Sequence, residues 1–228
     1  MFMQVEARFR RRAKSGEIIS ELNNSLLKRL SKIHGLWAES KSVEDAYFDP
    51  GSGESAASDL SPCLVNAVNG AISYASRLPA AITDKATSDD SLTLTFDSDE
   101  INFHKFCNDV FPEIVEVFCP YRAAIITDLE QDLDDFEDIV QESQRTGKDI
   151  DGRDSVFRIY PVNYFDDAMC NRAFGITAHE VIEVLTTSIE RVEEIAGGAL
   201  LLVSSEPVTG SELASIDSLV RGCLSKIE

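Results

Sequence analysis

Three aspartates in the middle of the chain have the residue type and spacing that come nearest to catalytic chemistry. Asp134, Asp135 and Asp138 form a DDxxD pattern. On one helix face, carboxylates at this spacing can hold magnesium ions that bridge a diphosphate. Prenyl-transferring enzymes need a second acidic motif on a facing helix, and the sequence shows none. Because a chance match is expected in so acidic a segment, a metal-dependent enzyme using these aspartates remains an alternative and not the favoured interpretation.

Other enzyme motifs are incomplete. His179-Glu180-Val-Ile-Glu183 lacks the second histidine of an HExxH zinc site, and Thr177 three residues before Glu180 already fits a helix capping box. The three histidines are far apart, and no serine stands in a GxSxG setting. Gly197-Gly198 lacks the Lys-Ser/Thr that completes a phosphate-binding loop. We therefore expect no catalytic residues, no metal site and no cofactor.

The aspartates belong to residues 127–142, in which eight of sixteen residues are acidic and none is basic. Thr127 and Glu130 fit a capping box, so a helix is predicted to begin here. One apolar stripe of helical period follows, made of Leu129, Leu133, Phe136 and Val140. The opposite, solvated side then carries Asp134, Asp138 and Glu142.

The acids at positions i and i+4 are like-charged neighbours that together cost the helix about 1 kcal/mol. A solvated helix face tolerates such a cost without any functional reason. The sharper hypothesis is that this face docks on a basic partner protein. The residues predicted to bind it are Asp134, Asp135, Glu137, Asp138 and Glu142, with Phe136 as the aromatic anchor beside them.

The chain of 228 residues has a formal net charge of −19. Residues 1–41 carry nine basic and four acidic side chains, a balance of +5, which leaves −24 for residues 42–228. Such a field repels nucleic acid and anionic lipid and attracts a cationic protein. We expect the basic side chains of residues 8–14 to pair with the chain's own acids and not with nucleic acid. This basic run comprises Arg8, Arg10, Arg11, Arg12 and Lys14.

The five cysteines are scattered and contain no CxxC pair, which argues against a disulfide framework or a zinc site. Reduced, mostly buried thiols fit a cytoplasmic protein. Arginines occupy the place where a signal peptide needs an apolar stretch, and no apolar run approaches the roughly 18 residues of a membrane span. We expect a cytoplasmic protein that does not contact a membrane.

Hydrophobic periodicity predicts helices and hairpins in an irregular order. Strands are predicted at residues 4–9, 91–96, 121–126 and 156–162 and in a hairpin of 189–195 with 199–205. Helices are predicted at 15–37, 61–75, 103–118, 127–142 and 177–185 and as a closing helix over 209–224. Without a regular βαβ period, this order predicts an α+β fold with a mixed or antiparallel sheet and packed helices.

We expect a single domain over residues 1–228. Residues 49–59 are rich in Gly, Ser and Pro and predict a surface loop. This loop could separate an N-terminal subunit of residues 1–50 from the body, although it is short for a domain linker.

Three features give the chain a resemblance to immunity proteins of bacterial polymorphic-toxin systems, closest in layout to the Imm52-type families. They are the early strand and long helix ending at Trp37, the segment Val156-Phe-Arg-Ile-Tyr160 with Pro161, and the tail of residues 192–207 that runs into the closing helix. The resemblance covers about a third of the chain and carries over no functional residues. It implies a cytoplasmic, non-catalytic antitoxin that binds a cognate secreted toxin domain, such as a nuclease with a basic cleft or an effector of type VI secretion.

Beside the metal-dependent enzyme, two alternatives remain open at this point. One is an acidic DNA mimic that inhibits DNA-binding proteins, which predicts binding to several unrelated partners. The other is a scaffold with no charged interface. An antitoxin, by contrast, is expected to bind one partner by complementarity of its acidic surface.

Overall fold

The computed structural model describes residues 3–51 and 55–225. All its strands lie in one sheet of nine strands, in the order β2-β3-β4-β5-β1-β6-β7-β9-β8, and every pair is antiparallel. The predicted α+β class is thereby confirmed. The strands are β1 (Gln4–Arg12), β2 (Tyr47–Asp49), β3 (Ala56–Asp59), β4 (Val68–Tyr74), β5 (Asp89–Asp97), β6 (Arg122–Ile126), β7 (Val162–Asp166), β8 (Arg191–Ile195) and β9 (Gly198–Leu202).

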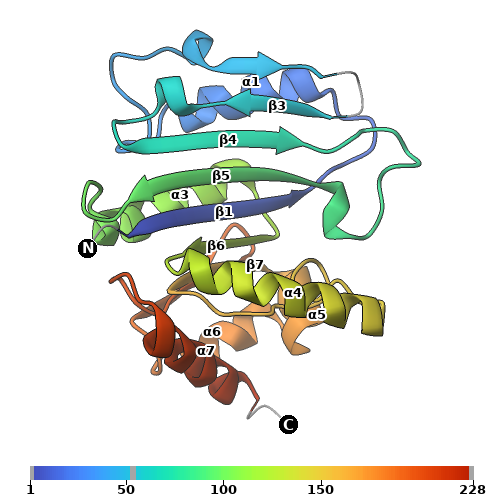
Figure 1. Ribbon diagram of the computed structural model, residues 1–228, viewed down its shortest axis with the longest axis vertical. Helices are drawn as coiled ribbons and strands as arrows, with labels where there is room; N and C mark the ends of the chain where they lie inside the picture. The colour runs from blue at the N-terminus through green and yellow to red at the C-terminus, as the bar shows by residue number, and fades with distance from the viewer. Residues whose placement is uncertain (1–2, 52–54, 226–228) are drawn as a thin grey trace.

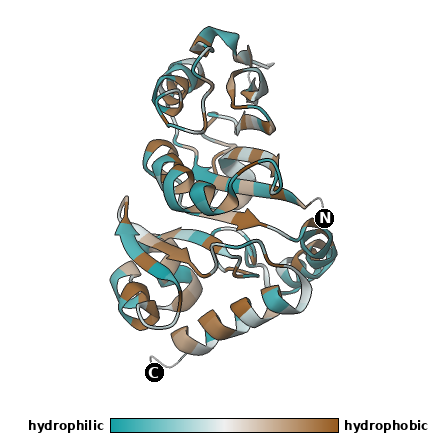
Figure 2. Cartoon of the chain, turned by 90° about the vertical axis from the view of Figure 1, so that its left-hand side faces the viewer, coloured by the Kyte–Doolittle hydropathy of each residue, from teal (hydrophilic) through white to brown (hydrophobic). Residues whose placement is uncertain are grey.

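Helices lie on both faces of the sheet. They are α1 (Ile19–Leu30), α2 (Phe103–Lys105), α3 (Phe111–Phe118), α4 (Leu129–Thr146), α5 (Asp167–Phe174), α6 (Ala178–Leu185) and α7 (Gly210–Leu224). A π-helical turn, Phe106–Val110, joins α2 to α3. The closing helix α7 is confirmed, and Figure 2 shows that it carries both hydrophobic and paler segments, as an amphipathic helix does. No helix within the described residues is long and apolar enough to cross a membrane.

The sheet separates two hydrophobic cores, one on each face. Val5, Ala7 and Phe9 point to one face, where α1 and α3 pack in the main hydrophobic core. Residues of β7 and β9 that point to the other face pack against α5, α6 and α7 in a second core. In Figure 1, α1 and α3 lie behind the upper half of the sheet, and its front face over β3, β4 and β5 has no helix on it.

The helix predicted over residues 61–75 is wrong. A short 3₁₀ turn at Ser61–Cys63 is followed by the strand β4, in which buried and exposed residues alternate strictly. Val68 and Ile72 are four residues apart, a spacing that fits one face of a helix as well as one face of a strand. In the structure, Gly70 lies on their buried face and Asn69 on the exposed face, as the alternation of a strand requires. Any side chain at Gly70 would meet Leu94 and Leu64 at less than 3 Å. Residues 56–59 form the edge-proximal strand β3 where a loop was predicted, and 52–54 of that loop lie outside the described residues.

The strand predicted over residues 156–162 is also wrong, because β7 begins where it was expected to end. The backbone before β7 bonds to side chains of α7 and not to a neighbouring strand. Arg221 Nη2 donates to the carbonyls of Val156 and Phe157, and Ile159 N–H donates to Asp217 Oδ1. The segment therefore has buried apolar residues like those of a strand, without pairing with a neighbouring strand.

The other predicted elements are present with shifted ends. Helix α1 is shorter than residues 15–37, because it begins at Ile19 and ends at Leu30. The chain then turns at Gly35 with φ +86°, and Trp37 is a buried core residue beyond the helix. The hairpin of β8 and β9 turns at Ala196 and Gly197, both with positive φ. The cysteines are free and mostly buried, with Cys119 exposed on the surface.

Candidate functional site

Helix α4 packs on the sheet with part of its acidic side inward, which is opposite to the orientation predicted from its apolar stripe. Asp132 Oδ1 accepts a hydrogen bond of 2.6 Å from Tyr160 Oη, and Asp132 Oδ2 lies 3.3 Å from Arg8 Nη2. Asp135 is buried and accepts from both Nε and Nη2 of Arg158, the latter at 2.7 Å. Gln131 Nε2 also donates to Asp135. Paired charges therefore hold this helix to the body, together with apolar packing of Leu129 at its start.

The pKa values around this contact follow from its burial and charges. The hydrogen bond to Asp135 raises the pKa of Arg158, against the opposing effect of burial. Burial raises the pKa of Tyr160, and the nearby carboxylate of Asp132 raises it further. Both groups keep their protons through the neutral range, so the contact is fixed at physiological pH.

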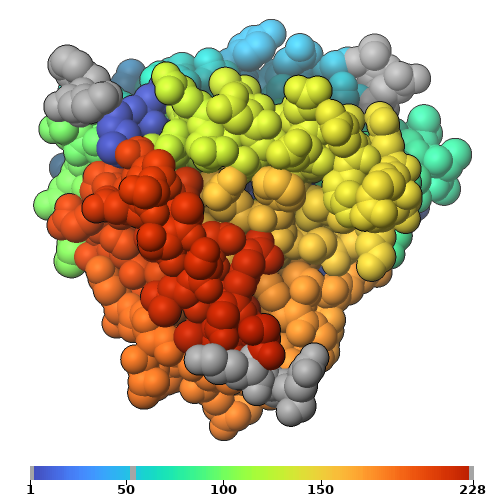
Figure 3. All heavy atoms as spheres, turned by 60° about the horizontal axis from the view of Figure 1, so that its bottom comes forward, coloured from blue at the N-terminus to red at the C-terminus, as the bar shows by residue number. Residues whose placement is uncertain are grey.

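Two members of the apolar stripe of α4, Leu133 and Phe136, face solvent as a consequence of this orientation. Leu133 is 74% exposed, the largest value among the exposed large hydrophobic residues, and Phe136 is 64% exposed. Ile139 and Val140 are partly buried on the same side. Figure 3 shows α4 as a yellow-green band running across the surface next to α7. Large apolar groups exposed side by side are characteristic of interaction surfaces.

This apolar stripe forms one wall of a groove of about 720 Å³. The floor is the part of the sheet beside α4 that no helix covers, where Arg8 and Arg10 of β1 and Ser91 and Thr93 of β5 point outward. Asp149 and Asp151 lie at one end, in the segment that follows α4. Strand pleating explains the floor, since alternate residues of β1 point to opposite faces.

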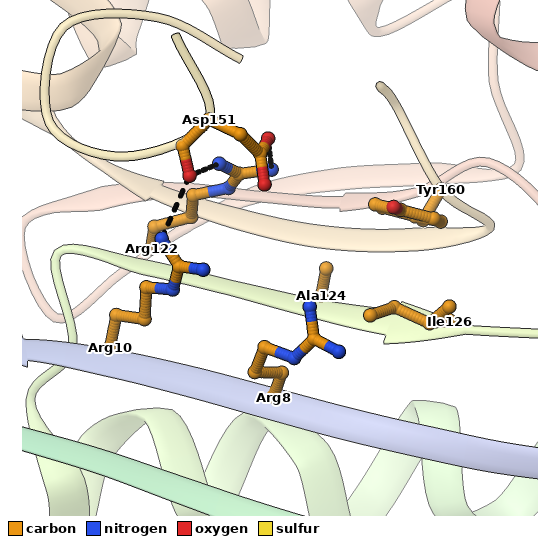
Figure 4. A pocket seen from close by; sticks show the side chains of 7 residues that line it. All are labelled: Arg8, Arg10, Arg122, Ala124, Ile126, Asp151 and Tyr160. Carbon is orange, nitrogen blue, oxygen red and sulfur yellow. Dashed lines mark hydrogen bonds and ion pairs between the residues drawn. The ribbon is translucent and has the colours of Figure 1, made fainter. Parts of the chain in front are cut away.

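The arginines of β1 are engaged by the chain's own acceptors, as predicted. Figure 4 shows that Arg10 and Arg122 both reach Asp151. Their Nη1 atoms each donate to the Asp151 carbonyl at 2.8 Å, and Arg122 Nη2 lies 2.7 Å from the Asp151 carboxylate. The cavity among these side chains measures only about 20 Å³, so it is a packed ion cluster and not a ligand site. Further pairs are Arg8–Glu6, Arg11–Glu17, Arg11–Asp90 and Arg12–Asp166.

Of the six residues predicted to bind a partner, four are exposed and two are paired within the chain. Asp134, Phe136, Glu137 and Asp138 are exposed together on the outer side of α4. Asp135 is paired internally with Arg158, and Glu142 pairs with Arg145 along the helix. Partner binding stays a prediction for the exposed four.

The DDxxD aspartates do not converge. Asp135 points into the body, while Asp134 and Asp138 point into solvent on the outer side of the helix. Their carboxylates cannot act together on one ion in this arrangement. Across the described residues, no group of three or more His, Cys, Asp or Glu side chains is placed to hold a metal.

Sequence reasoning missed the groove residues Arg8, Arg10, Ser91, Thr93 and Leu133. Leu133 was recognised as part of an apolar stripe but assigned to the core. A signal was present in the second stripe of the same helix, Asp128, Asp132 and Asp135, which matches the alternating arginines of β1 in charge.

Comparisons with known proteins support the fold and nothing finer. No family model matches the chain, and no curated protein matches it. Among solved structures, it is similar to "Pseudomonas aeruginosa T6SS protein PA0821", with a TM-score of 0.51 and 10% sequence identity. The match covers 99% of this chain and 74% of the other. At this identity the likeness extends to the fold alone.

Proposed function

We propose that this protein is a non-catalytic immunity protein that binds a cognate toxin domain in the cytoplasm and neutralises it. The outer surface of α4 is the proposed binding surface, with Asp134, Phe136, Glu137 and Asp138 at its centre. A nuclease or another toxin with a basic cleft is the kind of partner that this surface fits.

The observation that carries the proposal is a set of acids without internal partners beside exposed apolar groups. Within the described residues, the side chains of Glu130, Asp134 and Asp138 make no hydrogen bond or ion pair, although they follow one another at steps of four along α4. The chain's arginines are used elsewhere, so this ridge of negative charge is left for another molecule. Leu133 and Phe136 stand next to it.

The two parts of this surface would do different work. Acids on the rim steer a cationic partner and raise its association rate, up to about 10⁸–10⁹ M⁻¹s⁻¹ at low salt. Affinity comes instead from a few desolvated anchors, among which aromatic residues are prominent. Fast capture suits an antitoxin, because unbound toxin acts until it is blocked.

The structural neighbour is compatible with this proposal. Its description as a T6SS protein names a secretion system, and the notion of an immunity protein for a secreted effector fits such a setting. This support comes from likeness of fold alone. The main support for the proposal is the charge and exposure of α4.

The test begins with the reading frame beside the gene of this chain: the C-terminal domain of its product is expressed alone and together with this chain, and is expected to be toxic when expressed alone. Co-expression is expected to restore growth, and the purified proteins are expected to form a complex. The triple variant Asp134→Asn/Glu137→Gln/Asp138→Asn should slow association by roughly tenfold at low salt, with little change at high salt. Absence of both protection and binding by the wild-type chain, or turnover of a small molecule by it, would contradict the proposal.

A further inference from the structure

The groove beside α4 has a floor whose polar groups are only partly used. Within the described residues, the Arg10 guanidinium donates through Nη1 to the Asp151 carbonyl and makes no other hydrogen bond. The hydroxyls of Ser91 and Thr93, also on this floor, make no side-chain hydrogen bond there. Unused donors on the floor of a groove are suited to the carbonyl groups of a polypeptide backbone that lacks its own partners.

The groove is open on the side opposite α4. Helix α4 supplies the apolar wall, and past the floor strands β1 and β5 the sheet continues uncovered over β4 and β3, as Figure 1 shows. The outward residues of β4 are small and exposed, namely Asn69, Ala71 and Ser73. A chain segment can therefore lie on this face without first displacing large side chains.

The size and charge of the groove limit what occupies it. At about 720 Å³ it accepts one segment and not a whole domain. A second copy of this chain is disfavoured, because it would bring two acidic α4 ridges together and like charges at an interface are repulsive. A helix satisfies its own backbone and would leave the floor donors unused, whereas an extended segment would engage them.

We propose that the groove receives one extended segment of the toxin that carries an apolar side chain flanked by lysine or arginine. The apolar side chain packs between Phe136 and Leu133, main-chain carbonyls accept hydrogen bonds from Arg10, and the basic side chains meet Glu130 and Glu137 at the rim. This inference rests on the proposed function and specifies where and how the toxin is held. In this arrangement, the contacts in the groove determine how slowly the complex dissociates, and the acids determine how fast it forms.

The experiment compares matched variants in binding to the same toxin domain. Thr93→Tyr fills the floor of the groove, whereas Thr95→Tyr places the same ring on the same face of β5, at a residue outside the groove lining. Phe136→Ala removes the anchor, and Leu219→Ala removes an exposed apolar residue of α7, which is 47% exposed. Thermal melting of each variant shows whether it is folded.

Phe136→Ala is expected to raise the dissociation constant by roughly 30-fold, and Thr93→Tyr by at least about tenfold, both through faster dissociation. Thr95→Tyr and Leu219→Ala should stay within about twofold of the wild type. If the wild-type chain binds the toxin and all four folded variants bind equally well, the groove inference is overturned while the proposed function stands. If the wild-type chain binds no toxin domain, both are overturned.

Discussion

Asp134 and Asp135 are adjacent in the sequence and have opposite roles in the structure. Asp135 has a side chain that is 6% exposed and is paired with Arg158, whose own side chain is 17% exposed. Asp134 is exposed and has no partner among the described residues. Because successive residues of a helix point about 100° apart, one of two neighbours can be interior while the other faces solvent. Negative charge alone therefore does not identify the binding residues of α4.

The exchange Asp135→Asn is expected to lower the free energy of unfolding by roughly 3 kcal/mol, because it leaves the Arg158 guanidinium half-buried without a counter-charge. The matched change Asp134→Asn removes the repulsion of Asp134 with its two like-charged i,i+4 neighbours. The free energy of unfolding should therefore stay within about 0.5 kcal/mol of the wild type, toward higher stability. Urea denaturation of both variants measures the difference. Equal stability of the two variants would show that the Asp135–Arg158 pair does not hold α4 to the body.

At the scale of elements, Asp128 connects two helices that are far apart in the sequence. Its Oδ1 accepts from Gln131 N–H and caps the start of α4, and its Oδ2 accepts from Gly210 N–H at the start of α7. The capping box predicted at Thr127 is wrong, because Thr127 Oγ1 donates to the Val208 carbonyl. Thr209, the residue before α7, makes no cap hydrogen bond either. One carboxylate thus caps both helices.

We expect Asp128→Ala to destabilise the protein by about 1–2 kcal/mol, since it removes the caps of two helices at once. The control Thr209→Ala should cost less than about 0.5 kcal/mol, because that side chain caps nothing. Hydrogen exchange gives a second readout, in which the first turns of both α4 and α7 lose protection in Asp128→Ala. Loss of protection in α4 alone would contradict the shared cap.

Local patterns predicted most elements correctly and failed where partners come from distant segments. Strands such as β1 and β5 alternate clearly in the sequence, and the hairpin of β8 and β9 is marked by its glycines. The orientation of α4 could not be derived in this way, because the helix has both an apolar and an acidic stripe. Which stripe faces inward is decided by Arg8, Arg158 and Tyr160, whose positions depend on the whole fold. The groove follows from that choice and was beyond prediction for the same reason.

At the scale of the whole molecule, the −19 charge acts on folding and on binding with opposite dependence on salt. Charges of one sign spread over the surface repel one another and oppose the compact state. Many arginines, by contrast, sit in short pairs that are partly buried, such as Arg122–Asp151 at 2.7 Å and Arg77–Asp90 at 2.7 Å. Salt screens the distant repulsion more strongly than these close contacts.

Raising the ionic strength from about 0.01 to 0.15 M shortens the screening length from roughly 30 to 8 Å, so we expect the free energy of unfolding to increase by on the order of 1 kcal/mol. Over the same range the association rate with the toxin domain should fall, because steering by the acidic ridge is screened too. The variant Asp134→Asn/Glu137→Gln/Asp138→Asn removes three negative charges from the ridge and should weaken both dependences. Urea denaturation and association kinetics, measured in the same buffers, test this pair of opposite slopes. A stability that falls with added salt would mean that exposed ion pairs, and not long-range repulsion, dominate the electrostatics of the fold.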